Sequence, residues 1–317
     1  MPARPIALSF SGSGHLLCYQ LGAARTLLFR TAWGERITHF AGSSGGAIAA
    51  SVCALLSKDQ LGKFAVEVAC KGHGFAGLSD ALAGHGPHAL DDSQALSVND
   101  RLFLSATHCR TGRNALFSRF ESAEMLQRCV LASAAIPRAF HPFDMLKRNP
   151  TYPEAGGIIV PTRCESDGGT AAARDAPPGE LPFSPHGEAF VDGGITNTAP
   201  LLDALCGAHT LTVSPVSGPN GCLRPGRLVE VRSAEAGTVN VPLPAEALAH
   251  YHLTPDDTST RVPGIAPRLA GMRVYLSVDN LRALRGSLGA SPRVLTRWYE
   301  RGLSDAEQFA ARFDPPD

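Results

Sequence analysis

The stretch Thr-His-Phe-Ala-Gly-Ser-Ser-Gly-Gly-Ala at residues 38–47 contains the pattern Gly-x-Ser-x-Gly, with Ser44 at its centre. A nearly uninterrupted apolar run, residues 47–56, follows directly. We expect a strand, a tight turn and a buried helix, an elbow that holds a serine hydroxyl above the end of a sheet. Gly42 and Gly46 suit such a turn because it leaves little room for Cβ atoms. The helix would point its N-terminal N–H groups toward Ser44.

The composition limits the class of protein. The chain has 317 residues, enough for one large α/β domain or two small ones. Lysine plus arginine number 29 and aspartate plus glutamate number 29, so the net charge of zero gives no reason to expect a nucleic-acid partner. Because the chain has 32 glycines, Gly-x-Ser-x-Gly can also arise by chance in a loop, and its context has to support it.

The cysteines and the N-terminal residues bear on location. None of the 8 cysteines forms Cys-x-x-Cys and several lie in apolar runs, which is typical of free, buried thiols in a reducing compartment. The first residues are too poor in apolar side chains for a signal peptide. The longest apolar run, near residues 45–56, is shorter than the ~20 residues that span a bilayer. We therefore expect a cytoplasmic protein, either soluble or bound peripherally to a lipid surface.

A glycine-rich turn follows the first predicted strand, residues 5–10. The turn reads Ser-Gly-Ser-Gly-His, and an apolar helix is expected after it, over residues 16–28. Strand, glycine turn and helix form the usual context of an anion-binding loop. The turn lacks the Gly-Lys-Ser/Thr of a Walker loop and the third glycine of a dinucleotide loop. It is either an oxyanion hole formed by the N–H groups of Gly12, Ser13 and Gly14 or a plain strand–helix turn.

Apolar periodicity predicts further elements. Alternating residues indicate two strands, 101–107 and 114–120, joined as a hairpin by the short linker between them. Helices are expected over residues 58–70 and 123–135, and another strand over residues 209–214.

Two long segments show little periodicity. Residues 144–187 are rich in proline and glycine, which favours disorder over the alternative, a functional lid. Residues 215–270 are again proline-rich and irregular. Helical pieces are expected after them over residues 281–288, 293–301 and 308–313, the last preceded by a capping box that begins at Ser304.

A third motif, Asp192-Gly193-Gly194, ends a short predicted strand. An aspartate at this position can project its carboxylate beside the carboxyl edge of a sheet, where ligands bind in open α/β folds. The alternative is a turn aspartate that caps its own backbone.

The order of these three motifs resembles the patatin-like phospholipases, and the chain is most similar to the animal-type branch that includes adipose triglyceride lipase and adiponutrin. Residues 8–25 look like that branch's first strand, oxyanion loop and helix. The pentapeptide around Ser44 and the Asp192 motif stand where the family keeps its nucleophile and its aspartate. Further similar stretches are residues 117–120, 132–137, 212–218 and 280–313.

The resemblance implies an α/β fold with three α/β/α layers, a mostly parallel central sheet and a C-terminal helical tail. Residues 5–217 would form the patatin-like catalytic domain, with an insertion at about 144–187. Residues 218–317 would supply an irregular segment and C-terminal helices that pack on the same unit.

The resemblance also implies a chemistry without metal or cofactor. Ser44 would attack an ester carbonyl, and Asp192 would accept its proton and later activate water, a Ser–Asp dyad without histidine. The implied oxyanion hole consists of Gly12, Ser13 and Gly14, and the implied supporting glycines are Gly42, Gly46, Gly193 and Gly194.

Three residues complicate this interpretation. Leu17 replaces a family glycine and could crowd the oxyanion hole or shift the helix, and Thr198 stands where the family has an asparagine. His15 invites a Ser-His-Asp triad, but the order of the motifs favours the dyad.

The most favoured function is hydrolysis of lipid esters, with triacylglycerol as the substrate. Alternatives within the same chemistry are phospholipase or lysophospholipase activity and acyl transfer between glycerolipids. A scaffold without catalysis on a lipid surface is supported only by Leu17 and Thr198, and a nucleotide-binding module only by the glycines of the first turn. The expected partners are the lipid substrate and the surface of a lipid droplet or membrane, and the sequence indicates no particular protein partner.

Overall fold

The structure is a computed structural model that describes part of the chain. The described residues are 4–71, 90–109, 114–136, 158–163, 183–215, 228–233, 237–242, 251–253, 268–269, 272–273, 290–312 and 314–315.

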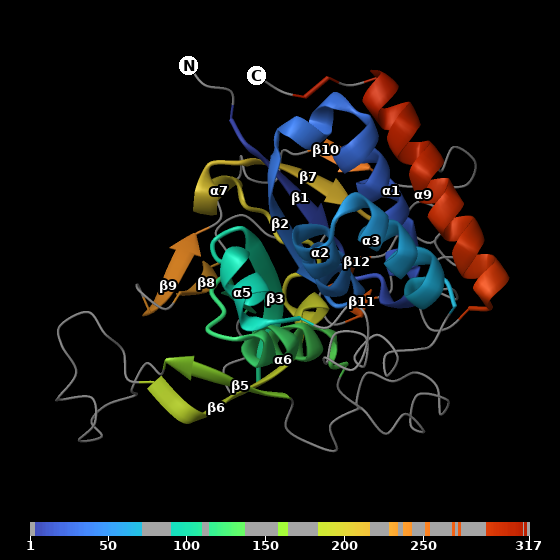
Figure 1. The fold of residues 1–317 in the computed structure, drawn as a ribbon. Helices are drawn as coiled ribbons and strands as arrows, with labels where there is room; N and C mark the ends of the chain where they lie inside the picture. Colours follow the sequence, from blue (N-terminus) through green and yellow to red (C-terminus); the bar gives the residue numbers. More distant parts are fainter. Residues whose placement is uncertain are drawn as a thin grey trace, which may run out of the picture.

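Ten strands form one central sheet in the described part of the chain (Figure 1). They are β1 (Ile6–Phe10), β2 (Ile37–Ser43), β3 (Leu102–His108), β4 (Asn114–Phe117), β5 (Ile158–Arg163), β6 (Phe183–Asp192), β7 (His209–Val213), β8 (Leu228–Ser233), β9 (Gly237–Pro242) and β10 (Tyr251–Leu253). The order across the sheet is β10-β7-β1-β2-β3-β4-β8-β9, while β6 pairs with β3 and β5. A separate short pair consists of β11 (Arg268–Leu269) and β12 (Met272–Arg273).

The centre of the sheet is parallel. Strands β10, β7, β1, β2 and β3 are parallel to one another. Antiparallel pairs join β3 to β4 and β6, β5 to β6, and β8 to β9. The predicted α/β class with a mostly parallel central sheet is confirmed, and so is the hairpin of β3 and β4.

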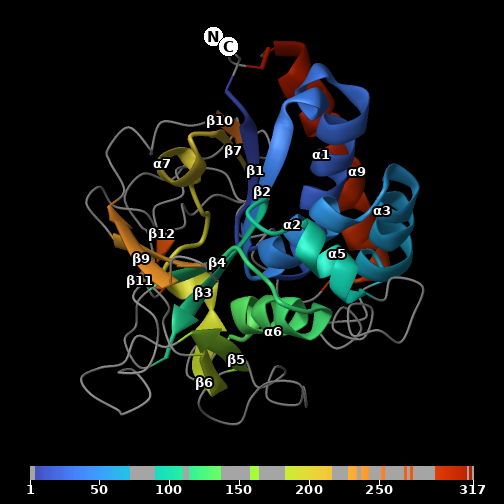
Figure 2. The same ribbon diagram turned by 60° about the vertical axis from the view of Figure 1, so that its left-hand side comes forward.

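Helices lie on both faces of this sheet. Figure 2 shows α1, α2 and α9 on one side and α7 on the other. The described helices are α1 (Leu17–Arg30), α2 (Gly45–Leu55), α3 (Lys58–Phe64), α5 (Asp92–Ser97), α6 (Ala123–Ala134), α7 (Asp203–Cys206) and α9 (Pro292–Arg312). None of these described helices combines the length and the apolar character that crossing a bilayer requires.

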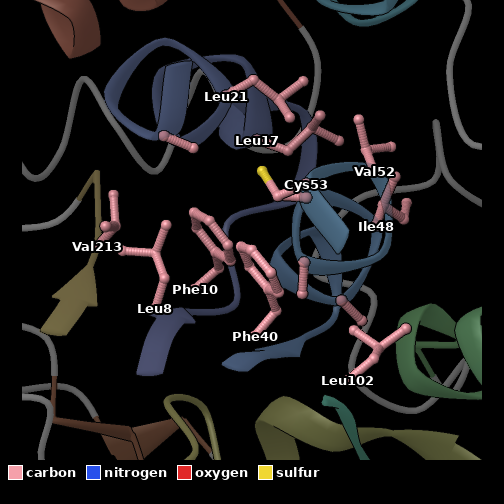
Figure 3. Close-up of a cluster of buried hydrophobic side chains, with 14 of the residues drawn as sticks. Leu8, Phe10, Leu17, Leu21, Phe40, Ile48, Val52, Cys53, Leu102 and Val213 are labelled. Atoms are coloured by element: carbon pink, nitrogen blue, oxygen red, sulfur yellow. The ribbon is translucent and has the colours of Figure 1, made fainter. Parts of the chain in front are cut away.

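The alternation of side chains along β1 explains the two faces. Ile6, Leu8 and Phe10 belong to the large core beneath the helices, whereas Ala7 packs in a small cluster on the opposite face. Period-two alternation requires this division, because successive strand side chains point to opposite sides. Leu17 lies in the large core, close to Leu21 (Figure 3).

The C-terminal helix α9 packs along α1, as Figure 1 shows. The two backbones approach closely at two glycines. A Cβ on Gly22 would lie 3.1 Å from the Leu303 nitrogen, and one on Gly302 would lie 3.0 Å from the Ala23 nitrogen, with backbone carbonyls closer still. Close contact of the helices therefore depends on the absence of side chains at this crossing.

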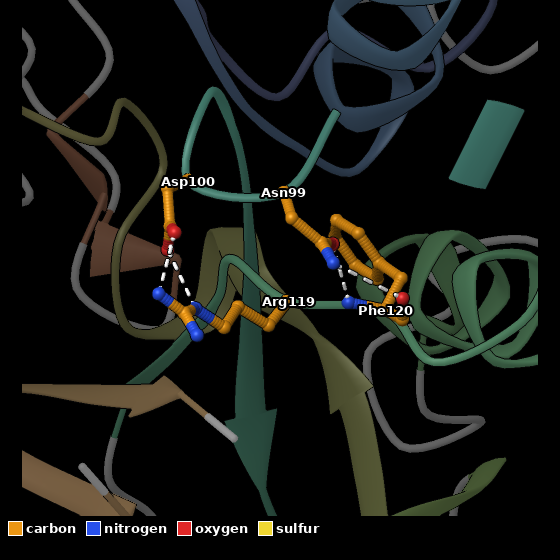
Figure 4. Close-up of polar contacts among 4 residues, drawn as sticks. All are labelled: Asn99, Asp100, Arg119 and Phe120. Atoms are coloured by element: carbon orange, nitrogen blue, oxygen red, sulfur yellow. Dashed lines mark hydrogen bonds and ion pairs between the residues drawn. The ribbon is translucent and has the colours of Figure 1, made fainter. Parts of the chain in front are cut away.

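The turn before β3 is tied to the segment after β4 (Figure 4). Arg119 donates two hydrogen bonds, at 2.9 and 2.7 Å, to the carboxylate of Asp100, whose φ is 59°. Asn99 exchanges hydrogen bonds with the backbone of Phe120, donating at 3.4 Å and accepting at 2.7 Å. These contacts fix the N-terminal end of β3, before Ser105 and the residues that follow it.

The helix expected over residues 58–70 is present as α3 continued by a π-helical turn, η3 (Ala65–Ala69). Two other predictions need correction. The segments predicted to be irregular contain strands, β5 and the beginning of β6 in residues 144–187, and β8 to β11 in residues 215–270. Cross-strand pairing stabilises these strands.

The end of the chain also differs from the prediction. Residues 293–301 and 308–313 were expected to form separate helices, but α9 is continuous, and Ser304 lies within it rather than at a helix start. Burial of one face against α1 outweighs the local capping signal. The helix predicted over residues 281–288 lies outside the described residues.

Candidate functional site

Ser44 occupies the turn between β2 and α2. Its backbone has φ 55° and ψ −129°, a conformation that residues other than glycine rarely adopt. A Cβ on Gly46 would lie 2.5 Å from the Ser11 carbonyl oxygen, and one on Gly42 would lie 2.7 Å from the Ala47 nitrogen. The predicted strand, tight turn and helix are therefore present, and the two glycines are required by close packing of backbone on backbone.

A side chain from another element holds the elbow. The Ser44 N–H donates to the Ser133 hydroxyl at 3.0 Å, and this hydroxyl donates to the Ser105 carbonyl at 2.5 Å. All three residues are buried, and Ser133 lies near the end of α6. The hydroxyl thus connects the strained turn to β3.

The glycine-rich loop of residues 11–14 packs on the elbow. A Cβ on Gly12 would lie 3.5 Å from the Ser44 Cβ, and one on Gly45 would lie 2.8 Å from the Gly14 nitrogen. The loop therefore covers both Ser44 and the first residue of α2, which brings together the first two motifs of the sequence.

The N–H groups of this loop are not equivalent. The Gly12 N–H donates to the Thr198 carbonyl at 2.9 Å. This bond corrects the expectation that Gly12, Ser13 and Gly14 all offer free N–H groups. Within the described part of the chain, the N–H groups of Ser13 and Gly14 have no hydrogen-bond acceptor. They remain available to an anion beside the N-terminus of α2, where the helix dipole also favours negative charge.

Strand pairing brings Asp192 next to Ser44. On one edge of β3, Ser105 is the partner of Ser43, the last residue of β2. The next residue, Ala106, is the partner of Asp192, the last residue of β6. Strand β6 thus occupies the edge of β3 that β2 leaves open when it ends, and the two motif residues arrive at the same point from opposite directions.

The Asp192 carboxyl is buried, with 6% of the residue exposed. Desolvation raises its pKa from 3.8 to about 6, although hydrogen bonding from Ser44 and from the Gly194 N–H opposes the rise. The Gly194 N–H donates to Oδ1 at 2.7 Å. Among the described residues, no donor meets the full hydrogen-bond geometry at Oδ2. This carboxylate has the properties of a base poised near neutral pH.

A network of buried polar side chains supports the aspartate. Thr107 donates to the Asp192 carbonyl at 2.8 Å and contacts the Thr196 hydroxyl at 2.8 Å. The Asn114 amide lies within hydrogen-bond distance of the Thr196 and Ser105 hydroxyls, at 3.0 and 2.8 Å. The Asn197 amide donates to Asn114 Oδ1 at 3.1 Å. The turn after Asp192 is therefore held by β3 and β4 through side chains.

The structure thus brings together Ser44, Asp192, the glycine loop and the two glycines after the aspartate. A Cβ on Gly193 would lie 2.7 Å from the Ser105 hydroxyl, and one on Gly194 would lie 2.9 Å from the Asp192 carboxylate. Thr198 donates its hydroxyl to the Gly194 carbonyl at 3.0 Å. Leu17 is buried in the core, with 1% exposed.

Sequence reasoning did not identify the residues that support the site. These are Ser105, Thr107, Asn114, Ser133, Thr196 and Asn197. Small polar residues inside otherwise apolar strands and helices are the signal that could have pointed to them, because buried polar groups need partners.

Comparisons with known proteins give similar relatives. No protein-family model matches the chain. It is 28% identical over 228 residues to human patatin-like phospholipase domain-containing protein 4, covering 67% of this chain and 72% of that protein. It is 26% identical to mouse 1-acylglycerol-3-phosphate O-acyltransferase Pnpla3, over 68% of this chain and 45% of that protein. It is 24% identical to mouse patatin-like phospholipase domain-containing protein 2, over 96% and 50%.

Solved structures give weaker likenesses. VipD from Legionella pneumophila has a TM-score of 0.43 at 10% identity, covering 98% of this chain and 67% of that one. Human GIVD cytosolic phospholipase A2 has a TM-score of 0.34 at 12% identity, covering 96% and 61%. The sequence comparisons confirm the predicted resemblance: over most of its length, the chain is similar to patatin-like phospholipase domain proteins.

Proposed function

We propose that this protein is a lipid acyl hydrolase that uses Ser44 as its nucleophile and Asp192 as its base, with triacylglycerol as the favoured substrate. The observation that carries the proposal is the meeting of a strained, buried serine with a buried aspartate whose pKa is raised to about 6. The names of the relatives, which include phospholipase domains and an acyltransferase, agree with acyl chemistry on lipids.

The reaction follows from the proposed roles. Ser44 Oγ attacks the ester carbonyl carbon while its proton passes to the Asp192 carboxylate. The N–H groups of Ser13 and Gly14, together with the N-terminus of α2, stabilise the oxyanion of the tetrahedral intermediate. As the intermediate collapses, the leaving alkoxide takes the proton from Asp192 and departs as an alcohol, which leaves an acyl-enzyme.

Water then completes the cycle. Asp192 accepts a proton from a water molecule while the water oxygen attacks the acyl carbonyl. The proton then passes from Asp192 to Ser44 as the fatty acid leaves. If another glycerolipid hydroxyl replaces this water, the same site transfers the acyl group. Hydrolysis and acyl transfer therefore share every residue of the site and differ only in the acceptor.

The scaffold alternative loses its main support. Leu17 packs into the core among apolar side chains, so its size is accommodated there. The Thr198 carbonyl and hydroxyl both make hydrogen bonds to glycines of the site, so this residue contributes to the site's structure. These contacts favour a competent site over a degenerate one.

The test is fatty-acid release from emulsified triolein and, separately, from phosphatidylcholine vesicles. Ser44→Ala and Asp192→Asn serve as variants, with circular dichroism to verify folding. We expect triolein hydrolysis that both variants abolish. Fatty-acid release mainly from phosphatidylcholine would indicate that the substrate is a phospholipid instead of triacylglycerol. Wild-type rates in Ser44→Ala, or a folded wild-type protein that neither hydrolyses lipid nor reacts with a fluorophosphonate, would overturn the proposal.

A further inference from the structure

Gln20 on α1 is a fully buried amide whose hydrogen bonds all go to the glycine loop and to the end of β7. Its Oε1 accepts from the Ser13 hydroxyl at 2.9 Å. Its Nε2 donates to the Ser11 carbonyl at 2.7 Å and to the Val213 carbonyl at 3.2 Å. The residue has 0% exposure. An amide this deeply buried needs such partners, and these three join the loop to the end of β7.

Two backbone hydrogen bonds fix the same loop as well. The Ser11 N–H donates to the Val213 carbonyl at 3.1 Å, and the Gly12 N–H donates to Thr198 at 2.9 Å. Gln20 and the Ser11 N–H therefore share one acceptor, Val213. The loop is held at residues 11, 12 and 13, while the N–H groups of Ser13 and Gly14 have no acceptor among the described residues.

This arrangement matters for charge development on an oxyanion. Donors contribute most when they are fixed in place before the reaction, because no reorganisation is then needed. A displacement of about 1 Å at such a site can reduce the rate by about 10²-fold. Gly14 lies against Gly45, next to Ser44, so a movement of the loop moves the two N–H groups relative to the nucleophile.

We propose that Gln20 is a positioning residue that holds the Ser13 and Gly14 N–H groups in place for the oxyanion of the ester substrate. This inference rests on the function proposed above. Gln20 touches no reacting atom, and it acts through the Ser13 hydroxyl and the Ser11 carbonyl. The competing explanation is that the amide only fills space in the core.

The experiment compares Gln20→Leu with Thr26→Val. Leucine approximates the volume of glutamine without its hydrogen bonds. Thr26 is a matched control on the same helix, buried at 0% exposure and donating to the Leu303 carbonyl at 3.3 Å, away from the loop. One readout is kcat and KM for a soluble p-nitrophenyl butyrate ester. The second, independent of activity, is hydrogen exchange of the Ser11 and Gly12 amides.

We expect Gln20→Leu to lower kcat by about 10- to 100-fold with KM changed less than about twofold, because positioning affects the transition state more than ground-state binding. The Ser11 and Gly12 amides should exchange at least about tenfold faster, since their hydrogen bonds report the position of the loop. Thr26→Val should change neither. Ser13→Ala combined with Gln20→Leu should lower kcat by less than the product of the two single effects.

Three results would overturn the inference: unchanged exchange in Gln20→Leu, faster exchange with unchanged kcat, or equal effects in Thr26→Val. If the wild-type protein neither hydrolyses esters nor reacts with a fluorophosphonate, the proposed function fails, and with it the link between Gln20 and an oxyanion. The exchange measurement still decides in that case whether Gln20 holds the loop.

Discussion

Each side of the site contains a feature that destabilises the folded protein, and the two features differ in kind. The serine side, residues 42–46 with the loop of residues 11–14, contains a backbone strained at Ser44, with φ 55°. The aspartate side, residues 192–198 with β3 and β4, contains a buried carboxyl whose pKa desolvation raises to about 6. Glycine packing imposes the first, and side-chain hydrogen bonds support the second. Each side should therefore respond to a different kind of substitution.

The largest effect is expected from a side chain at the crowded backbone contact. Alanine at Gly46 would place its Cβ 2.5 Å from the Ser11 carbonyl oxygen, and closer to that of Phe10. We expect Gly46→Ala to reduce the free energy of unfolding by about 3 kcal/mol or more, because neither backbone can move freely. Urea denaturation measures this change.

Gly12→Ala is the matched control. Its Cβ would meet the Thr198 methyl at 3.4 Å and the Ser44 Cβ at 3.5 Å, which are ordinary contacts. The expected loss of stability is less than about 1 kcal/mol. Equal losses in the two variants would contradict the idea that backbone contact at Gly46 determines the elbow.

The aspartate side should show a stability change that depends on pH. In the unfolded chain Asp192 ionises near 3.8, but in the folded protein near 6. Well below pH 3.8 the carboxyl is protonated in both states and contributes nothing. As the pH rises through 3.8 toward 6, the unfolded chain loses its proton first, and wild-type stability falls by up to about 3 kcal/mol, a loss that persists above pH 6.

Asp192→Asn removes this penalty. The variant should be more stable than wild type at pH 8, by up to about 3 kcal/mol, and its advantage should largely disappear at pH 4. Urea denaturation at both pH values measures the difference, and Ser44→Ala serves as an inactive control that retains the carboxyl. An advantage that is independent of pH would show that the charge of Asp192 is not what destabilises this side.

The support of the aspartate by side chains leads to a third prediction. Asn114→Leu removes the amide that links Ser105, Thr196 and Asn197. We expect a loss of about 2 kcal/mol of stability, since buried partners lose their hydrogen bonds, and about a tenfold loss of kcat, since the turn holding Asp192 loosens. Urea denaturation and ester hydrolysis measure the two effects.

Asn99→Leu is the control for that variant. Asn99 also exchanges hydrogen bonds with a neighbouring segment, at Phe120, but it precedes β3 at the end away from Asp192. The free energy of unfolding of this variant should fall by about 1 kcal/mol, and its kcat should be unchanged. If both variants lose activity equally, the network around Asn114 has no special relation to Asp192.

The contrast also explains what the sequence could predict. Backbone crowding at Ser44 requires glycines within one short stretch, and strand, turn and helix follow locally from that stretch, so the elbow was predictable. The first strand was predictable from its short apolar run, and the hairpin from alternating residues on both sides of a short linker. The pairing of Asp192 with Ala106 depends on which strand occupies an open sheet edge, and local sequence carries little information about that.

Dependence on long-range contacts also explains why the sequence did not reveal the supporting residues. Asn114, Thr196 and Ser133 are single polar residues whose partners are more than 80 positions away in several cases, as in the bond from Asn114 to Thr196 with a separation of 82. The commitment of the Gly12 N–H to Thr198 is another long-range contact, and it was missed for that reason. The continuity of α9 through Ser304 was missed because packing on α1 outweighs a local capping signal.

The smallest predicted effect tests the strain at Ser44 directly. Ser44→Gly and Ser44→Ala both remove the hydroxyl, but only glycine tolerates φ 55° with ψ −129°. We expect the glycine variant to be more stable than the alanine variant by about 1 kcal/mol in urea denaturation. At the neighbouring Ser43, in the regular strand β2, the order should reverse by about 0.5–1 kcal/mol, because glycine there only adds freedom to the unfolded chain. The same order at both positions would mean that the elbow is not strained, and the serine side would then differ from the aspartate side only in its close packing.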